Sequence, residues 1–327
     1  MKNNLSARCH CNSQSVASPF RSRMNSSENI KVIISYSYHH GINLHVNKKM
    51  FSSGLMLLNL PVSQVLSRIG SYICTAKKSI TGILYITIQP NLALYHNQPD
   101  YSTKLTTRNE LVHVVPQIYI EASKAAPTLD VRVIHDSIKN TARNLKFPPQ
   151  IIFINQSNVS EQSLKSYLNS NFNLNNIHLI QTIHSDIELK EESNTINSKI
   201  EDIQIYDNVC LGGTFDNLHY GHKVLLSTAQ LLCNKSLTIG VTDLNMIKSK
   251  VLWEMIEPVE KRIENLLEYL KDVDPLIDYK ITAISDPYGP AISDEHLSCI
   301  VVSEETVRGA EKINEIRQQR KMTPLHV

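Results

Sequence analysis

Glycine is absent from residues 83–211, although the chain contains ten glycines in all. A loop that wraps a phosphate through its backbone needs several glycines close together, so this long region holds no such loop. Cysteine is sparse and scattered: the six cysteines include one close pair, Cys9-x-Cys11, and no Cys-x-x-Cys. This usage argues against a disulfide scaffold or a structural zinc site, and it suits a reducing compartment.

Acidic residues are missing between Glu28 and Asp100, where several basic residues occur. Within this stretch the apolar residues from Val62 to Ile73 follow helical spacing. A basic, acid-poor, amphipathic segment is typical of mitochondrial targeting, and an ordinary surface helix with few acids is an equally good interpretation. We therefore treat residues 50–79 as a candidate targeting segment. The location stays open between mitochondrial, with an association with a membrane there, and cytoplasmic.

Long uninterrupted apolar runs are lacking too. The run from Leu55 to Leu66 is broken by Asn59 and Pro61, so we expect no transmembrane segment. The formal net charge of +2 is too small to attract nucleic acid by bulk electrostatics, and no nucleic-acid partner is expected. The 327 residues suffice for two ordinary domains, and with 42% hydrophobic residues they can bury a core.

Composition divides the chain into five stretches. We expect residues 1–49 to be disordered, or to be an upstream extension before a true start at Met50. After the candidate targeting segment, residues 80–183 predict a small N-terminal α/β region of unassigned role. Residues 184–206 are rich in acidic and small polar residues and predict a linker, and residues 207–327 form a second domain. Strands are expected in the N-terminal region at 84–88, 129–134, 150–154 and 177–183, with a helix at 160–168.

The most informative stretch begins with an apolar run that ends at Gly212-Gly213. From Lys223 onwards the apolar residues recur at helical spacing, so the pattern predicts a strand, a glycine turn and a helix. A helix that begins there points its free N–H groups and the positive end of its dipole at the turn, which suits phosphate binding. His219 and His222 are three residues apart, so they can lie on one side and donate hydrogen bonds to phosphoryl oxygens.

These residues resemble the signature of the HxGH nucleotidyltransferases. The signature is Gly212-Gly213-Thr214-Phe215-Asp216 followed by His219-x-Gly221-His222. Three later stretches are similar, in the same order, to the phosphopantetheine adenylyltransferase half of animal bifunctional coenzyme A synthases. They are Leu244-x-x-x-Lys248-Ser249-Lys250, Asp286-Pro287-Tyr288-Gly289-Pro290-Ala291 and Val301-Val302-Ser303-Glu304-Glu305-Thr306-x-Arg308-Gly309. Four ordered motifs are more specific than any one of them.

The pattern of the second domain agrees with a parallel sheet. Strands are expected at 237–242, 278–284 and 298–302, with a helix at 259–270. Strand, helix, strand order implies right-handed crossovers, and ligands of such sheets bind at the carboxyl ends of the strands. The fold class is therefore α/β, and the resemblance implies a Rossmann-like nucleotidyltransferase domain after the small α/β region and a disordered or basic N-terminus.

The resemblance implies that ATP and 4′-phosphopantetheine react to give dephospho-coenzyme A and pyrophosphate, with Mg²⁺ on the ATP. By the same resemblance, His222 and His219 contact the ATP phosphates, and Lys250 or Lys248 brings a positive charge over them. Lys250 is favoured, although spacing does not separate the two lysines. Thr214 would bond the acceptor phosphate, and Arg308 a phosphate or ATP. The other residues expected at the substrates are Gly212, Gly213, Phe215, Asp216, Ser303 and Glu304, of which Asp216 is expected to order the turn.

Two features depart from the family pattern. The kinase half of the bifunctional enzymes needs GxxxxGK[ST], which this sequence does not contain, so we expect no dephospho-coenzyme A kinase activity here. A serine-rich helix start expected after the Val301 motif is missing as well, which suggests a truncated domain. Two alternatives stay open: a cytidylyltransferase that makes a CDP-alcohol, and a catalytically weak nucleotide-binding or scaffold protein.

Overall fold

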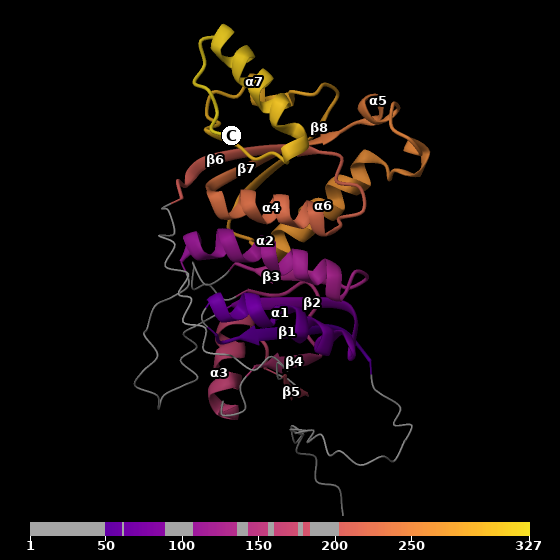
Figure 1. The fold of residues 1–327 in the computed structure, drawn as a ribbon, viewed down its shortest axis with the longest axis vertical. Coiled ribbons are helices and arrows are strands. Elements are labelled where there is room, and N and C mark those ends of the chain that lie inside the picture. The colour runs from indigo at the N-terminus through magenta and orange to yellow at the C-terminus, as the bar shows by residue number, and fades with distance from the viewer. Residues whose placement is uncertain are drawn as a thin grey trace, which may run out of the picture. The chain divides into compact units, whose positions relative to one another are not determined.

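The computed structural model describes residues 50–60, 62–88, 107–135, 143–155, 160–175, 179–183 and 203–327. The stretch 1–49 and the larger part of the predicted acidic linker, 184–202, lie outside the described residues. Two parallel sheets with their helices make up the described part of the chain (Figure 1), and both sheets belong to one compact unit.

The first sheet has the strand order β3-β2-β1-β4-β5, and all its strands are parallel. The strands are β1 (Phe51–Leu58), β2 (Ile80–Ile88), β3 (Asp130–Ile134), β4 (Ile151–Ile154) and β5 (Ile180–Thr182). The helices are α1 (Val62–Lys77), α2 (Arg108–Ala125) and α3 (Glu161–Phe172). This is the order of a doubly wound sheet, in which helices cover both faces.

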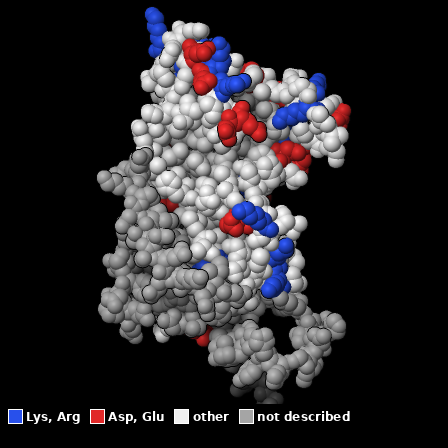
Figure 2. Space-filling view, in the orientation of Figure 1, with Lys and Arg blue, Asp and Glu red and all other residues white. Residues whose placement is uncertain are grey.

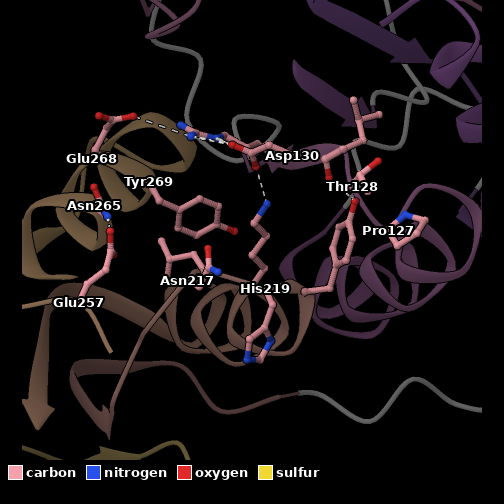
Figure 3. A pocket seen from close by; sticks show the side chains of 14 residues that line it. Pro127, Thr128, Asp130, Asn217, His219, Glu257, Asn265, Glu268 and Tyr269 are labelled. Atoms are coloured by element: carbon pink, nitrogen blue, oxygen red, sulfur yellow. Dashed lines mark hydrogen bonds and ion pairs between the residues drawn. The ribbon is translucent and has the colours of Figure 1, made fainter. Parts of the chain in front are cut away.

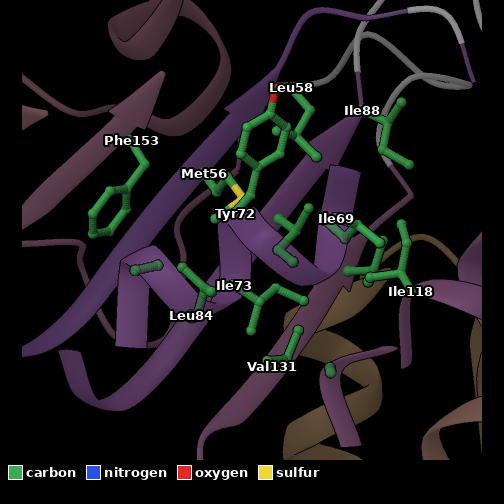
Figure 4. Close-up of a cluster of buried hydrophobic side chains, with 14 of the residues drawn as sticks. Met56, Leu58, Ile69, Tyr72, Ile73, Leu84, Ile88, Ile118, Val131 and Phe153 are labelled. Carbon is green, nitrogen blue, oxygen red and sulfur yellow. The ribbon is translucent and has the colours of Figure 1, made fainter. Parts of the chain in front are cut away.

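The apolar side chains of β1 explain how the helices cover the first sheet. Met56 packs with Ile69 of α1 and with α2 on one face (Figure 4), and Leu57 packs with Leu168 of α3 on the other. A strand covered on both faces has a nearly continuous apolar sequence, as β1 has from Leu55 to Leu58. Helix α2 begins at Thr107, whose side chain forms a capping box with Glu110.

The predicted boundary at residue 80 is wrong as the start of the first sheet. Residues 50–79 contain the central strand and its first helix, and β1 lies between β2 and β4. The basic charge of residues 50–79 does not predict this strand. The basic side chains Lys77 and Lys78 are exposed, whereas the apolar side chains of the same stretch are buried in the core. The proposed targeting role of these residues stays a prediction.

The second sheet has the order β8-β7-β6-β9, again all parallel. Its strands are β6 (Tyr206–Gly213), β7 (Cys233–Thr242), β8 (Asp278–Ile284) and β9 (Cys299–Ile300). The helices are α4 (Tyr220–Leu232), α5 (Leu244–Ile247), α6 (Val259–Val273) and α7 (Val307–Gln319), with 3-10 turns η2 (Trp253–Met255), η3 (Gly289–Ile292) and η4 (Glu304–Thr306). Helices α4 and α6 pack on one face, and η3 and α7 on the other.

The sheet predicted for the second domain is therefore confirmed, with every expected strand present. The last strand is shorter than expected, because β9 spans only Cys299–Ile300. Its outer side is paired all the same: Ile300 N donates to the carbonyl of His326 over 2.8 Å, and His326 N donates to the carbonyl of Ser298 over 3.0 Å. The end of the chain thus lies as an extra partner along β9.

The surface of the described residues carries charges of both signs. On the face shown in Figure 2, lysine and arginine side chains alternate with aspartate and glutamate instead of forming one basic area. None of the described helices combines the length and apolar character that crossing a bilayer requires.

Candidate active site

The turn after β6 has an unusual backbone. Phe215 and Asn217 both adopt the left-handed region, with φ of 51° and 49°. The ring of Phe215 is buried and folds back under the end of β6, so that a Cβ atom at Gly213 would lie 3.0 Å from it. A side chain at position 213 would force this turn to open. This steric limit explains why the second residue of the pair is glycine.

The two histidines of the turn lie against each other. His219 is the N-cap residue of α4, and its ring stacks on that of His222 with 3.9 Å between ring centroids and 25° between planes. Phe215 contacts the other side, 5.3 Å from His222 between centroids. A Cβ atom at Gly221 would come within 3.0 Å of the His219 ring, so the glycine leaves room for the stack. The structure therefore brings the predicted pair together at a helix N-terminus.

His222 is neutral at physiological pH. Burial, the neighbouring His219 and the positive charge of Lys250 together lower its pKa to about 4, although Asp216 acts in the opposite direction. Its Nδ1 atom is buried and has no hydrogen-bond partner among the residues that the structure describes. A neutral imidazole can donate one N–H to a phosphate oxygen, and an arriving anion would favour its protonated form.

Thr214 and Lys250 meet at the ends of β6 and β7. Lys250 Nζ donates a hydrogen bond to Thr214 Oγ1 over 2.7 Å, and Thr242 Oγ1 lies 3.2 Å from the same oxygen. The Lys250 side chain is exposed, and no carboxylate of the described residues pairs with it. Lys248 is also exposed, at the end of α5, but has no side-chain contact to Thr214. Of the two lysines, Lys250 is therefore the one that hydrogen-bonds Thr214, and the choice between them stays a prediction.

Arg262 is the residue that sequence reasoning missed. It is 1% exposed, and its guanidinium donates to three carbonyls: Thr214 over 2.6 Å, Thr242 over 2.8 Å and Glu257 over 2.8 Å. One side chain therefore joins the loops after β6 and β7 to the start of α6. Helical spacing could have predicted the burial of Arg262. It lies four residues before the buried Leu266 and hence on the inner face of α6.

Asp216 has a structural partner. Its Oδ1 accepts a hydrogen bond from the backbone N–H of Glu257 over 3.0 Å. The carboxylate therefore ties the turn after β6 to the segment before α6, which is the ordering role expected from the sequence. A similar arrangement holds the later loop, where Asp286 Oδ1 accepts from the N–H groups of Tyr288 and Gly289, each over 2.9 Å.

The Val301 motif follows β9, which ends beside Cys210 of β6, three residues before β6 itself ends at Gly213. Ser303 forms a capping box with Thr306, and Glu304 lies in η4. Arg308 lies in the first turn of α7, because this capping box begins a 3-10 turn that continues directly into the helix. Ser303, Glu304 and Arg308 are exposed, and the structure records no contact between them and the two histidines.

A cleft of about 610 Å³ lies beside the histidine turn, between the two halves of the described unit. Figure 3 shows Tyr269, Asn265 and Glu257 of the second half along one wall, Thr128 and Pro127 of the first half along the other, and His219 at the edge. The cleft therefore puts residues of the N-terminal region next to the predicted catalytic turn.

Two family models match the chain, one in each half. The Cytidylyltransferase-like model matches residues 210–327, and the COASY N-terminal domain model matches residues 52–177. The second match begins within β1, which agrees with the position of that strand in the first sheet.

Curated relatives match part of the chain. A phosphopantetheine adenylyltransferase of Methanothermobacter thermautotrophicus is 42% identical over 122 residues, which cover 37% of this chain and 71% of the relative. A phosphopantetheine adenylyltransferase of Saccharomyces cerevisiae is 30% identical over 190 residues, covering 49% of this chain and 62% of the relative. An uncharacterized protein of Schizosaccharomyces pombe is 34% identical over 154 residues, which cover 47% of this chain and 46% of the relative. The chain thus spans less than two thirds of both yeast relatives.

Proposed function

Because the chain belongs to the phosphopantetheine adenylyltransferase family, we propose that it transfers the adenylyl group of ATP to 4′-phosphopantetheine. A phosphate oxygen of phosphopantetheine attacks the α-phosphorus of ATP and forms a new P–O bond. The bond from the α-phosphorus to the bridging oxygen breaks, and pyrophosphate leaves with that electron pair. The attacking oxygen is already anionic and needs no general base, so catalysis consists of positioning and charge stabilisation.

One observation carries the proposal: the ammonium group of Lys250, which pairs with no carboxylate of the described residues, donates to Thr214 at the strand end from which the histidine turn starts. A hydroxyl and an ammonium group side by side can bond two oxygens of one phosphate. The Lys250 charge is also near enough to His222 to lower its pKa. We assign Thr214 and Lys250 to the phosphate of phosphopantetheine. We assign Lys250 also to the α-phosphate of ATP, which the phosphopantetheine phosphate attacks.

The histidine pair suits the ATP side of the reaction. His219 and His222 lie at the N-terminus of α4, where free N–H groups and the helix dipole favour anions. Negative charge grows on the oxygens of the leaving pyrophosphate as the P–O bond breaks. A hydrogen bond from His222 to these oxygens would strengthen at that point and would lower the barrier. We place Arg308, Ser303 and Glu304 further along the ATP, on the family resemblance alone.

Magnesium enters the proposal as part of the substrate. The described residues include no group of three or more His, Cys, Asp or Glu side chains placed to hold a metal ion. We propose that Mg²⁺ reaches the site on the ATP phosphates and neutralises part of their charge. Excess EDTA should abolish pyrophosphate release, and added Mg²⁺ should restore it.

The test of the function compares two substrate pairs with the full chain. Pyrophosphate release is measured with ATP and 4′-phosphopantetheine, and in parallel with CTP and phosphocholine. We expect release with the first pair and formation of dephospho-coenzyme A in equal amount. Release only with the second pair would establish the CDP-alcohol alternative. Release with neither pair, together with ATP binding in a titration, would establish a nucleotide-binding protein without this activity.

The cellular location is a separate proposal that rests on the composition of residues 50–79. We propose a mitochondrial location with attachment to a membrane there, and the cytoplasm is the alternative. Cell fractionation followed by protease protection of the mitochondrial fraction would decide between them. Recovery of the chain only in the cytosolic fraction would end the mitochondrial proposal.

A further inference from the structure

The first turn of α4 is bonded to the N-terminal half through the two residues that directly follow the histidines. Tyr220 follows His219, and its hydroxyl donates to the carbonyls of Ala126 over 2.9 Å and Leu129 over 2.5 Å. Lys223 follows His222, and its ammonium group donates to a carboxylate oxygen of Asp130 and, over 3.0 Å, to the carbonyl of Val131. All four acceptors belong to one short segment, residues 126–131, between α2 and the start of β3.

Helix geometry separates these contacts from the histidine rings. Tyr220 and Lys223 are three residues apart and lie on one side of α4, and His219 and His222 have the same spacing on the next side. One side of the first turn therefore bonds the N-terminal half, and the neighbouring side presents the imidazoles. Any rotation or shift of this turn relative to the N-terminal half would displace both rings.

Lys223 is the buried member of its ion pair with Asp130, whose side chain is 34% exposed. The Lys223 side chain is 5% exposed, and Asp130 is its only acidic partner among the described residues. Asp130 is also held by Arg132, whose guanidinium donates to it over 2.8 Å and to Asp272 of α6 over 2.6 Å. Figure 3 shows Asp130 among the side chains that line the cleft, with the dashed line of the Lys223 ion pair at its carboxylate.

An ion pair with one buried and one half-buried charge adds little stability, but it fixes the relative positions of the two segments that it joins. Removing two charges from water costs about as much as their attraction returns, so an apolar pair of similar volume often gives equal stability. The neighbours of Lys223 would accept such a pair, because Val224 and Leu231 of α4 already pack against the apolar core of the first half. An apolar pair would not reproduce the directional hydrogen bond from Lys223 to Asp130, which fixes how α4 lies against the start of β3.

We propose that Asp130 and Lys223 are positioning residues for adenylyl transfer, and that the N-terminal half sets the placement of the His219 and His222 rings through them. The inference rests on the proposed function. It gives residues 126–131 a part in the active site without any chemistry of their own. The ring stack has little spare room, because a Cβ atom at Gly221 would come within 3.0 Å of the His219 ring. A displacement near 1 Å at a reacting group costs roughly 100-fold in rate.

The first experiment compares Asp130→Asn with the double variant Asp130→Asn/Lys223→Met in the full chain. Asp130→Asn leaves a buried ammonium group facing an amide, so both thermal stability and kcat should fall. The double variant removes the stranded charge, so its stability should return towards wild type. We expect its kcat to stay about 10-fold or more below wild type, with KM for ATP within about 3-fold. Recovery of kcat together with stability would assign the pair a structural role only and overturn the inference.

Tyr85→Phe is the matched control. Tyr85 donates to Asp272 over 2.6 Å, so it bonds the same two halves but touches α6 and not α4. This variant should lose stability while keeping kcat. A loss of kcat in Tyr85→Phe as large as in Asp130→Asn would also overturn the inference. It would mean that weakening any bond between the two halves lowers kcat, and not the bond to α4 in particular.

A second readout does not depend on turnover. The imidazole resonances of His219 and His222 are recorded by NMR, with His222→Gln used for assignment. We expect displaced resonances for both rings in Asp130→Asn and in the double variant, and unchanged ones in Tyr85→Phe. If the wild-type chain shows no activity with ATP and phosphopantetheine, the proposed function fails, and this measurement alone decides: unchanged ring resonances in Asp130→Asn would refute the positioning role.

Discussion

Lys250 donates a hydrogen bond to the hydroxyl of Thr214 over 2.7 Å, although the two residues are 36 positions apart in the chain. The contact joins the loop after β7 to the end of β6. It leaves the ammonium charge exposed and without a carboxylate partner among the described residues. An unneutralised cation beside a hydroxyl is the arrangement that a phosphate group would complete.

Replacing Lys250 should therefore affect turnover far more than replacing Lys248. We expect Lys250→Met to lower kcat/KM for phosphopantetheine by about 100-fold, because a charge-assisted hydrogen bond to a phosphate contributes roughly 1.5–3 kcal/mol. Lys248→Met removes an equal charge two residues away and should change kcat/KM by less than about 3-fold. Steady-state pyrophosphate release measures both. Equal losses in the two variants would mean that bulk charge, and not the Thr214 contact, matters.

His222 should act on the transition state more than on ATP binding. We expect His222→Ala to lower kcat by about 100-fold or more, the range seen when one donor to a developing charge is removed. The dissociation constant for ATP, measured by calorimetry, should change much less. His296→Ala is the control, because that side chain is exposed and lies outside the histidine turn. Unchanged turnover in His222→Ala would remove this residue from the mechanism.

Arg262 should be essential to the shape of the site through its bonds to three backbone carbonyls. Arg262→Met leaves the carbonyls of Thr214, Thr242 and Glu257 without their donor, and we expect a loss of about 3 kcal/mol or more in the free energy of unfolding. Urea unfolding measures this loss. The neighbouring Lys261→Met removes an exposed ion pair with Glu264 and should change stability by less than about 1 kcal/mol. Similar losses in the two variants would contradict the role of Arg262.

His135, directly after β3, should make the fold acid-sensitive. It is buried, neither ring nitrogen has a partner among the described residues, and burial lowers its pKa to about 4. The unfolded chain has a higher histidine pKa, near 6.5, and so binds more protons. Stability therefore falls as pH drops from about 6.5 to about 4, by roughly 3 kcal/mol at most from this residue.

The variant His135→Leu tests this account. Leucine fills a similar volume and leaves no polar atom unpaired, so stability at pH 7 should be unchanged or higher. The slope of unfolding free energy between pH 6.5 and pH 4 should decrease. His222, whose pKa is also lowered to about 4, contributes in the same direction and keeps part of the slope. An identical slope in His135→Leu and wild type would contradict this account, because it would mean that folding does not change the pKa of His135.

The second sheet was predictable because its local signals agree with its tertiary structure. Apolar runs end at glycine or polar loops, and the helix of residues 259–270 has an apolar side that matches the buried side of α6. Thr214, His219 and His222 could be placed at a strand end and a helix start for the same reason. The distances between these side chains could not be predicted, because the stack of the two histidine rings depends on the left-handed backbone at Phe215 and Asn217.

The rest required contacts between distant segments. The strand β1 was missed because charge, and not its apolar run from Leu55 to Leu58, guided the interpretation of residues 50–79. Arg262 escaped notice because a charged residue in an amphipathic helix is usually exposed, and only three convergent carbonyls make its burial favourable. Lys248 and Lys250 could not be separated because the direction of each side chain depends on how the segment after α5 returns to β6.

The pairing of His326 with Ser298 and Ile300 has a consequence for the behaviour of the protein in solution. An unpaired outer strand offers a row of N–H and C=O groups to other chains and promotes edge-to-edge aggregation. Along β9 those groups already have their acceptors and donors within the same molecule. Variants that release the last residues should therefore lose solubility before they lose the histidine turn, and a rise in light scattering would precede any fall in ATP binding.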